Sequence, residues 1–281
     1  MNGKVVLVTG ATDGIGRQTA LELARMGATV LVHGRSARRA AATAAAIRAD
    51  AGNDQVEPVV ADFSSLEQVR GLAALVLERR PHLDVLINNA GVYMRRRRLT
   101  VDGFETTFQV NYLAGFLLTN LLLEAISAAA PSRIVTVSSA VHIGANLDLD
   151  ALPPGGWWSS GRAYAVSKLA QVLFSVELAE RLAGSGVTAN ALHPGVVATK
   201  LLRVGWFMPA GESVKRGARL SVHLASSSEV AGVTGKFFSN MRPVQPSPLA
   251  YDADLRRALW EESERMVGSP LRDARRPPSG P

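Results

Sequence analysis

The feature that most constrains the fold is an alternation of short apolar runs with longer segments of helical periodicity. The apolar runs predict buried strands over residues 4–9, 28–33, 56–61, 84–87, 133–137 and 186–192. Helical spacing predicts helices over residues 17–26, 37–49, 66–79, 104–128, 163–182 and 255–266. Strands that alternate with helices favour an α/β fold with a doubly wound parallel sheet and right-handed crossovers.

The length and composition suit one large domain. The chain has 281 residues, of which 47% are hydrophobic, and it contains no internal repeat and no linker in its middle. We expect a single domain over residues 1–268, with loops at 140–163 and 199–215 beside the substrate site. Within the second loop, residues 201–212 are expected to be irregular. Residues 269–281 are rich in Pro and Arg, which predicts a disordered tail.

A glycine-rich turn follows the first predicted strand. Gly10, Gly14 and Gly16 lie between this strand and a helix that starts near Arg17. Glycine lets the backbone approach a pyrophosphate, and a helix N-terminus offers free N–H groups and the positive end of its dipole. The spacing is Gly-x-x-x-Gly-x-Gly, and a plain tight turn is the alternative. The flanking strand and helix favour a dinucleotide site.

Short polar or glycine-containing motifs end the later strands as well. Residues 62–63 follow the third strand, 88–91 the fourth, 138–139 the fifth and 193–195 the sixth. In a parallel sheet, ligands bind outside the carboxyl ends of the strands. The motifs are therefore expected to meet at one edge of the sheet, although each alone is also compatible with a simple strand ending.

Tyr164 and Lys168 lie four residues apart in a predicted helix. Residues at this spacing lie one above the other, about 6 Å apart along the axis. A free phenol has a pKa near 10, and a neighbouring cation stabilises the phenolate and lowers that pKa. The pair can thus donate a proton to a carbonyl or accept one from an alcohol.

Taken together, these motifs resemble the short-chain dehydrogenase/reductase family. The matching pieces are residues 9–16, 88–91, Asn111, 138–139, Tyr164 with Lys168, and 194–195. Further segments are similar to the retinol dehydrogenase branch, namely residues 103–105, 169–174, 193–197, 235–239 and 259–260. The resemblance implies a Rossmann-type fold and an oxidoreductase that interconverts a ketone or aldehyde and an alcohol with a nicotinamide cofactor.

The resemblance also implies catalytic roles. Tyr164 would be the general acid/base, and Lys168 would lower its pKa and hold the nicotinamide ribose. Ser139 would hydrogen-bond the substrate oxygen, and Asn111 would support a water that links Lys168 to solvent. The residues expected to hold the cofactor are Gly10, Asp13, Gly14, Ile15, Gly16, Arg35, Asp62, Phe63, Asn89, Ala90, Gly91, Tyr164, Lys168, Pro194, Gly195, Val197 and Thr199.

The end of the second strand predicts that the cofactor is NADP(H). An acidic residue there would bind the ribose 2′-OH and repel a 2′-phosphate, but this chain has Gly34 followed by Arg35. An arginine offers a planar fork of donors to a phosphate, and Arg38 and Arg39 add positive charge. Asp13 argues the other way, because NADP enzymes of the family often have a basic residue there. A solvated arginine is the alternative for Arg35.

Composition excludes some other functions. The net charge is +7, but the surplus gathers in residues 95–98 and the tail instead of along one helix face, so we expect no nucleic-acid partner. There is no cysteine, and His142 and His193 have no second ligand at suitable spacing, so we expect no metal site. No stretch approaches the roughly 20 apolar residues of a membrane span, and no signal peptide is evident. We expect a soluble, cytoplasmic protein.

Two loops suggest the kind of substrate. Trp157, Trp158, Trp206, Phe207 and Met208 lie in loops beside the expected site, which predicts a bulky lipophilic carbonyl or alcohol. A satellite apolar cluster is the alternative. Arg95 and its three neighbours are expected to form a solvated loop, with contact to an acidic substrate as the alternative.

The state of assembly and the class of function each keep an alternative. The segment between Ser139 and Tyr164 is longer than in many family members and precedes a helix that often packs in dimers. We therefore expect a monomer or a homodimer. A non-catalytic protein that senses NADP(H) is the alternative to an enzyme, but such a protein would be expected to lose Tyr164 or Lys168.

Overall fold

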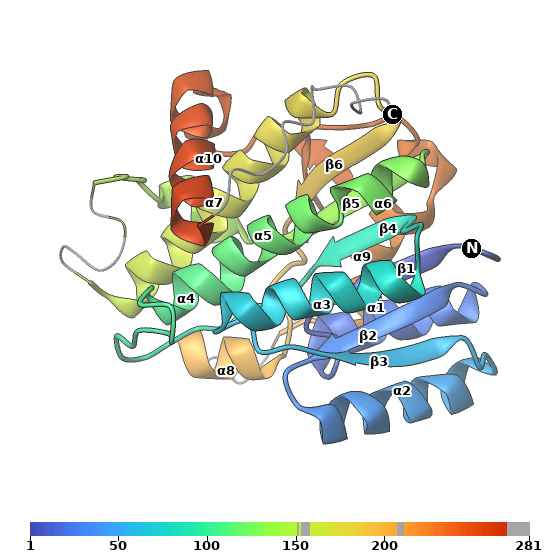
Figure 1. Cartoon of the computed structure of the whole chain (residues 1–281). Helices are drawn as coiled ribbons and strands as arrows, with labels where there is room; N and C mark the ends of the chain where they lie inside the picture. The colour runs from blue at the N-terminus through green and yellow to red at the C-terminus, as the bar shows by residue number, and fades with distance from the viewer. Residues whose placement is uncertain (151, 153–157, 207–210, 269–281) are drawn as a thin grey trace.

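The computed structural model describes residues 1–150, 152, 158–206 and 211–268 (Figure 1). Its centre is an eight-stranded sheet with the order β3-β2-β1-β4-β5-β6-β7-β8, in which every pairing is parallel except that of β7 with β8. The strands are β1 Val5–Val8, β2 Thr29–Gly34, β3 Val56–Val60, β4 Val85–Asn88, β5 Ser132–Val137, β6 Val187–Leu192, β7 Phe237–Ser239 and β8 Arg242–Val244. The predicted doubly wound parallel sheet is confirmed.

The central strands are apolar on both sides because helices cover both faces of the sheet. In β1, Val6 and Val8 join one core cluster, whereas Leu7 between them joins the other. The same alternation occurs in β2: Leu31 packs in the cluster of Leu7, whereas Val30 and Val32 pack on the opposite face. This period of two in an unbroken apolar run is what buries both faces of a strand.

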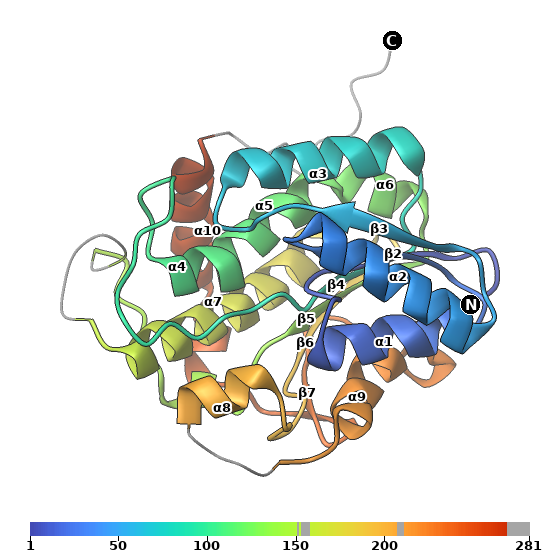
Figure 2. The ribbon, with the colours of Figure 1, turned by 90° about the horizontal axis from the view of Figure 1, so that it is seen from below.

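The helices form two layers (Figure 2). One face of the sheet carries α1 Gly14–Arg25, α2 Ala37–Ala51 and α9 Val214–Ser226, and the other carries α3 Leu66–Arg79, α5 Ala114–Leu121, α6 Leu123–Ala128 and α7 Ser160–Arg181. Side-chain oxygens cap the N-termini of α1, α2, α3 and α7 and fix where these helices begin; the capping residues are Asp13, Ser36, Ser65 and Ser159.

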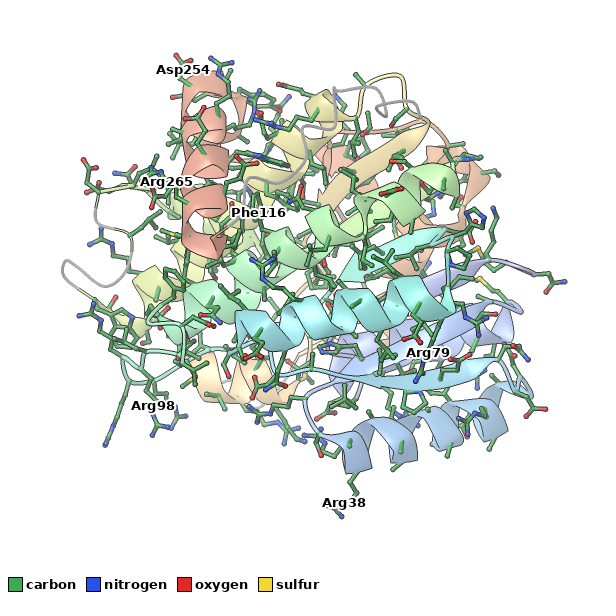
Figure 3. The ribbon with its side chains drawn as sticks, in the orientation of Figure 1. Arg38, Arg79, Arg98, Phe116, Asp254 and Arg265 are labelled. Carbon is green, nitrogen blue, oxygen red and sulfur yellow. The ribbon has the colours of Figure 1, made fainter. Side chains whose placement is uncertain are left out.

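The last helix, α10 Ala253–Val267, packs outside α7. Trp260 lies edge-on to Phe116, with the ring centroids 5.0 Å apart, and stacks near Phe174 at 5.8 Å. Figure 3 labels Phe116 within this interior. The buried Arg256 donates to Glu177 on α7 and to the Ala250 carbonyl, so the helix is held by aromatic packing and by a buried ion pair.

The predicted continuous helix over 104–128 is wrong in detail. The segment consists of α4 Thr106–Phe108, a π-helical turn η1 Gln109–Leu113, then α5 and α6. Asn111 lies in the π-turn, and its amide bonds both backbone groups of Val92 in the loop after β4. Isolated π-turns within helices frequently mark functional sites.

The two loops that the sequence predicts are partly helical. The first, 140–163, begins with the 3₁₀ helix η2 Ala140–Gly144 and ends in the first turn of α7. In the second, residues 201–212 are not all irregular, because α8 spans Lys200–Trp206 and α9 starts at Val214. A parallel bridge between Val197 and Glu212 closes this segment at its base.

Several short elements after β6 were not predicted from the sequence. They include η3 Ser228–Val230, the hairpin of β7 and β8, and η4 Pro248–Tyr251. The hairpin turn places Asn240 and Met241 at φ of 49° and 65°, which matches a two-residue type I′ turn. None of the helices in the described ranges combines the length and apolar character that crossing a bilayer requires.

Candidate active site

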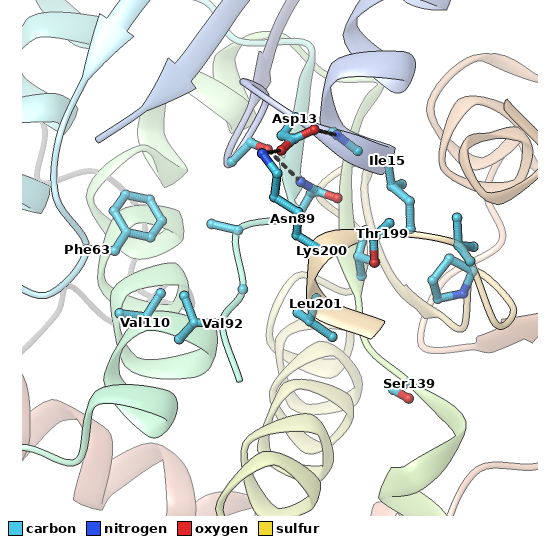
Figure 4. A pocket seen from close by; sticks show the side chains of 18 of the residues that line it. Asp13, Ile15, Phe63, Asn89, Val92, Val110, Ser139, Thr199, Lys200 and Leu201 are labelled. Carbon is cyan, nitrogen blue, oxygen red and sulfur yellow. Dashed lines mark hydrogen bonds and ion pairs between the residues drawn. The ribbon is translucent and has the colours of Figure 1, made fainter. Parts of the chain in front are cut away.

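A cleft of about 630 Å³ opens at the carboxyl ends of the parallel strands (Figure 4). Its walls come from the turns after β1 to β6 and from the start of α8. All of the residues predicted to hold the cofactor line it: Gly10, Asp13, Gly14, Ile15, Gly16, Arg35, Asp62, Phe63, Asn89, Ala90, Gly91, Tyr164, Lys168, Pro194, Gly195, Val197 and Thr199. Ser139 lines it too.

In the glycine turn, neighbouring atoms leave no room for a side chain at Gly10 or Gly16. Gly10 has a φ of 63°, and a Cβ there would lie 2.8 Å from the Ala90 Cα. A Cβ on Gly16 would lie 2.5 Å from the Gly10 carbonyl oxygen and would collide with the Asn89 amide. These contacts pack α1 tightly against the strand ends, so the first N–H groups of α1 border the cleft.

His33, the penultimate residue of β2, supports the glycine turn from below. Its Nδ1 accepts a hydrogen bond from the Gly10 N–H at 3.1 Å, and its Nε2 lies 3.0 Å from the Ala61 carbonyl oxygen. A carbonyl can only accept, so these partners require the tautomer with the proton on Nε2. The ring also stacks on Phe63 with a centroid distance of 4.4 Å. From the sequence, His33 was predicted only as the last residue of the second strand.

Asp13 has several partners at the start of α1. Its carboxylate accepts from the Gly14 N–H at 2.9 Å, lies 2.6 Å from Lys200 Nζ and lies 3.8 Å from an Arg39 nitrogen (Figure 4). The hydrogen bond with Lys200 lowers the pKa of Asp13, against an opposing effect of burial. The negative charge that argued against NADP(H) is therefore paired with two cations that also line the cleft.

Thr9 fixes the end of β4 against the end of β1. Its hydroxyl donates to the Ile87 carbonyl at 3.1 Å and accepts from the N–H groups of Asn89 at 2.9 Å and Ala90 at 3.0 Å. The Asn89 amide donates in turn to the carbonyls of Thr9 and Gly10. This network holds the floor of the cleft in one conformation, and it uses Asn89 to support the turn.

Tyr164 and Ser139 come together from different elements. Tyr164 lies one turn into α7, and Ser139 follows β5. Burial raises the pKa of Tyr164, a hydrogen bond with Ser139 opposes this, and the nearby Tyr93 adds to the rise. Burial is the dominant effect on this pKa, and the lowering by Lys168 stays a prediction. Tyr164 is thus protonated at neutral pH and can act as an acid.

Lys168 lies beneath the Tyr164 ring, with Nζ 5.4 Å from its centroid. Nζ donates to the Val137 carbonyl at 2.9 Å and to the Gln171 side-chain oxygen at 3.0 Å. Burial lowers the pKa of Lys168 to about 7, because the charged form is poorly solvated there.

Asn111 is the one predicted catalytic residue that does not line the cleft. It is buried in the π-turn, where its amide accepts from Val92 N–H at 2.7 Å and donates to the Val92 carbonyl and to the Ser167 hydroxyl. Its main-chain carbonyl accepts from the Gln171 amide at 2.6 Å. Asn111 therefore joins α7 to the loop after β4.

Eight further polar residues line the cleft without having been predicted as site residues, namely Thr12, His33, Arg39, Ser64, Thr106, Ser138, His193 and Lys200. Arg39 was predicted only to add positive charge near the cofactor. Arg38 does not line the cleft and projects outward from α2 (Figure 3). A polar residue at the end of a buried strand was the one signal that pointed to His33. No pattern in the sequence singled out Lys200.

The arginine run from Arg95 to Arg98 lies outside the cleft. All four side chains are exposed, Arg98 projects outward in Figure 3, and Arg95 donates to the Val204 carbonyl of α8 at 3.0 Å. This agrees with the predicted solvated loop.

His142 and His193, the two histidines near the site, differ in their hydrogen bonds. His142 accepts from Ser247 N–H at 3.1 Å through Nε2, and its Nδ1 lies 2.7 Å from the Ser139 carbonyl oxygen. His193 lines the cleft, and its Nδ1 is buried without a hydrogen-bond partner among the described residues.

Most of the residues that predicted a bulky substrate lie outside the described part of the structure. Trp157, Phe207 and Met208 lie outside the described residues, and so does the side chain of Trp206. Trp158 is half-buried. Apolar residues on other elements line the cleft, including Val92, Val110 and Leu201, which Figure 4 labels.

His33 predicts an acid-sensitive stability. Burial lowers its pKa to about 4, below the value of about 6.5 in an unfolded chain, so the unfolded state binds the proton first. Stability is full above about pH 7 and is lost as the pH falls from about 6.5 to about 4. We expect roughly 2 kcal/mol of unfolding free energy to be lost by pH 5 through this group.

Urea unfolding at pH 7 and pH 5 of the wild type and His33→Gln checks this expectation. The wild type should lose more stability between the two pH values than the variant does. His82→Gln, a change at an exposed site, serves as the control and should follow the wild type. Equal losses in wild type and His33→Gln would contradict the assignment.

Comparisons with known proteins agree with this geometry. The short chain dehydrogenase family model matches residues 4–205. Retinol dehydrogenase 13 from Homo sapiens is 43% identical over 286 residues, which cover 95% of this chain and 85% of that protein.

Two solved structures extend the comparison. An uncharacterized protein from Mycobacterium paratuberculosis has a TM-score of 0.80 and 36% identity, with coverage of 96% of this chain and 95% of that one. The Pseudomonas aeruginosa RhlG/NADP active-site complex has a TM-score of 0.70 and 27% identity, with coverage of 85% and 94%. With these matches and its cleft, the chain belongs to the short-chain dehydrogenase family of oxidoreductases and resembles the retinol dehydrogenase branch.

Proposed function

We propose that the protein is an NADP(H)-dependent oxidoreductase that interconverts a ketone or aldehyde and an alcohol on a bulky, lipophilic substrate. The observation that carries the proposal is that Ser139, Tyr164 and Lys168 lie together in one cleft beside the glycine turn, which is called the cradle below. The family accounts for the type of chemistry. The cofactor preference, the proton donor and the substrate class rest on the residues argued below.

The cradle fits a dinucleotide. Positions 10 and 16 have no room for a Cβ, so the backbone of the turn can come close to a pyrophosphate. Asp62 and Phe63 border the part of the cleft next to β2 and would flank the adenosine, whereas Val197 and Thr199 would hold the nicotinamide carboxamide. When bound, the nicotinamide supplies or accepts the hydride.

Tyr164 would donate and accept the proton. Its raised pKa keeps the phenol protonated. Its hydrogen bond with Ser139 brings the two hydroxyls together, and a substrate oxygen would bind beside both. In reduction, the phenol donates its proton to the oxygen as that oxygen gains charge, and Ser139 stabilises the same charge. In oxidation, the phenolate accepts the proton of the alcohol, and the Lys168 ammonium favours that phenolate.

The residues after β2 support the proposed preference for NADP(H). Gly34 stands where an acidic residue would repel a 2′-phosphate, and Arg35 and Arg39 both line the cleft there. The one nearby carboxylate, Asp13, is paired with Lys200 and Arg39. The RhlG structure, which contains NADP, is consistent with this preference.

The direct test is to incubate the protein with NADPH and a panel of ketones and aldehydes and to follow the nicotinamide absorbance. Carbonyl-dependent loss of NADPH supports the proposal. The alternative, a protein that senses NADP(H), predicts tight binding of NADPH with no turnover of any carbonyl in the panel or any alcohol in the reverse direction. The presence of both Tyr164 and Lys168 argues against that alternative.

We expect bulky substrates to be preferred. Val92 and Val110 lie together on one wall of the cleft, and Leu201 lies on α8 (Figure 4). The name of retinol dehydrogenase 13 also points to a lipophilic substrate. Polycyclic ketones should therefore have at least a tenfold higher kcat/KM than acetone-sized ketones, because a hydrophobic pocket gains about 1–3 kcal/mol per added methylene.

A matched pair of variants tests whether the cleft wall is responsible. Val110→Ala should lower kcat/KM for the polycyclic ketone and leave that for the small ketone nearly unchanged. Val101→Ala, at a position that is 83% exposed, should change neither value. Equal kcat/KM for small and polycyclic ketones in the wild type would contradict the proposed substrate class.

A further inference from the structure

Gln171 connects two parts of the site that the catalytic residues do not connect themselves. It lies in α7 one turn after Lys168 and is only 2% exposed. Its side-chain oxygen accepts from Lys168 Nζ at 3.0 Å, and its Nε2 donates to the Asn111 main-chain carbonyl at 2.6 Å. An ammonium only donates and a carbonyl only accepts, so these partners fix which end of the amide faces each of them.

The surroundings of Lys168 make this acceptor important. The second acceptor on Nζ is the Val137 carbonyl at 2.9 Å, so both acceptors found for the ammonium are neutral. The titratable groups that face it are Tyr164 on its own helix and His193 after β6. Among the described residues no carboxylate forms an ion pair with Lys168, which leaves hydrogen bonds to support the charge.

We propose that Gln171 is a positioning residue that holds the Lys168 ammonium in the cleft wall and couples it to the π-turn at Asn111. The role in turnover rests on the proposed function, whereas the effect on the charge of Lys168 does not. An amide suits the task because it accepts from the ammonium without neutralising it. A carboxylate would form a full ion pair with Lys168, and an alkyl side chain would leave both the ammonium and the carbonyl without this partner.

The consequence is measurable on Lys168 itself. Each acceptor that faces a buried ammonium favours its charged form, so removing one lowers the pKa further below the value set by burial. A hydrogen bond to a charged group is strong enough for a shift of about one pKa unit or more. A purely structural role of Gln171 would leave the pKa of Lys168 where it is.

The experiment is an NMR titration of the protein labelled with ¹³C in its lysine side chains, without added nucleotide. The sequence has only Lys4, Lys168, Lys200, Lys215 and Lys236, and Lys168→Met assigns the signal of Lys168. Gln171→Met should lower the pKa of Lys168 by about one unit or more. Gln171→Glu, which keeps an acceptor and adds a charge, should raise it above the wild-type value.

Ser175→Ala is the matched control. Ser175 is buried one turn further along α7 and contacts the main-chain carbonyl of Gln171, not its amide. Its loss should leave the pKa of Lys168 within about a fifth of a unit, far below the shift expected from losing an acceptor. An unchanged pKa in Gln171→Met would overturn the proposal. If that variant does not fold, an unchanged pKa in Gln171→Glu overturns it equally.

Turnover gives a second readout. Activity that needs the ammonium is present below the pKa of Lys168 and is lost above it, so Gln171→Met should move the alkaline limb of kcat/KM to lower pH by the shift seen in the titration. A limb that stays in place while the titration shifts would refute the role in turnover. A wild type that reduces no carbonyl would instead refute the proposed function, and the titration would still decide the effect of Gln171 on Lys168.

Discussion

Replacing Tyr164 by phenylalanine is expected to lower kcat by about 10²- to 10⁴-fold, the usual loss when a positioned acid is removed. Only the phenolic hydroxyl is removed, and the ring remains to fill the buried position beside Tyr93. Affinity for NADPH, measured by fluorescence titration, should therefore change by no more than about twofold, because the change removes the acid and leaves the cradle intact.

Tyr93→Phe is the matched control. Tyr93 lies next to Tyr164, with ring centroids 5.4 Å apart, and its hydroxyl donates to Ser160 at the start of α7. It does not line the cleft. This variant should retain nearly all of kcat. If Tyr164→Phe kept more than about half of the wild-type kcat, another group would have to be the acid.

The second large effect concerns the cofactor. NADPH should be favoured over NADH by at least tenfold in kcat/KM, because a charge-assisted contact is worth about 1.5–3 kcal/mol, or roughly ten- to hundredfold in affinity. Arg35→Ala should shrink this ratio mainly through the KM for NADPH. The KM for NADH, which has no 2′-phosphate, should change little.

Arg38→Ala is the control for the cofactor prediction. It removes the same charge near the start of α2, but Arg38 does not line the cleft and projects outward from α2 (Figure 3). The ratio of kcat/KM for the two cofactors should stay close to that of the wild type. An enzyme that used NADH as well as NADPH, or an Arg35→Ala variant with an unchanged ratio, would show that the 2′-phosphate binds elsewhere.

Much of the site could be predicted because it follows from one geometric rule. The carboxyl ends of parallel strands meet at one edge, so motifs far apart in the sequence, such as the glycine turn, Asn89 and Ser139, had to converge. Tyr164 and Lys168 are set by helical spacing alone. The positions of these residues could be predicted from the order of the strands and helices, without knowledge of individual side-chain contacts.

Other features depend on contacts that no local pattern encodes. A π-turn changes the apolar spacing by too little to be seen, so the segment around Asn111 read as plain helix. The α8 helix is seven residues long, too short for its period to be clear. His33 and Gln171 are buried polar residues that each have partners far away in the sequence, 60 residues in the case of Gln171 and Asn111.

The central claim is that Tyr164 protonates a carbonyl that is reduced by NADPH in this cleft. The most direct measurement is to supply NADPH that carries deuterium at its transferable position, together with a polycyclic ketone, and to examine the alcohol by mass spectrometry. The wild type should yield an alcohol with deuterium on the carbinol carbon, and Tyr164→Phe should yield almost none in the same time. An alcohol that lacks deuterium, or equal yields from the two proteins, would contradict the account.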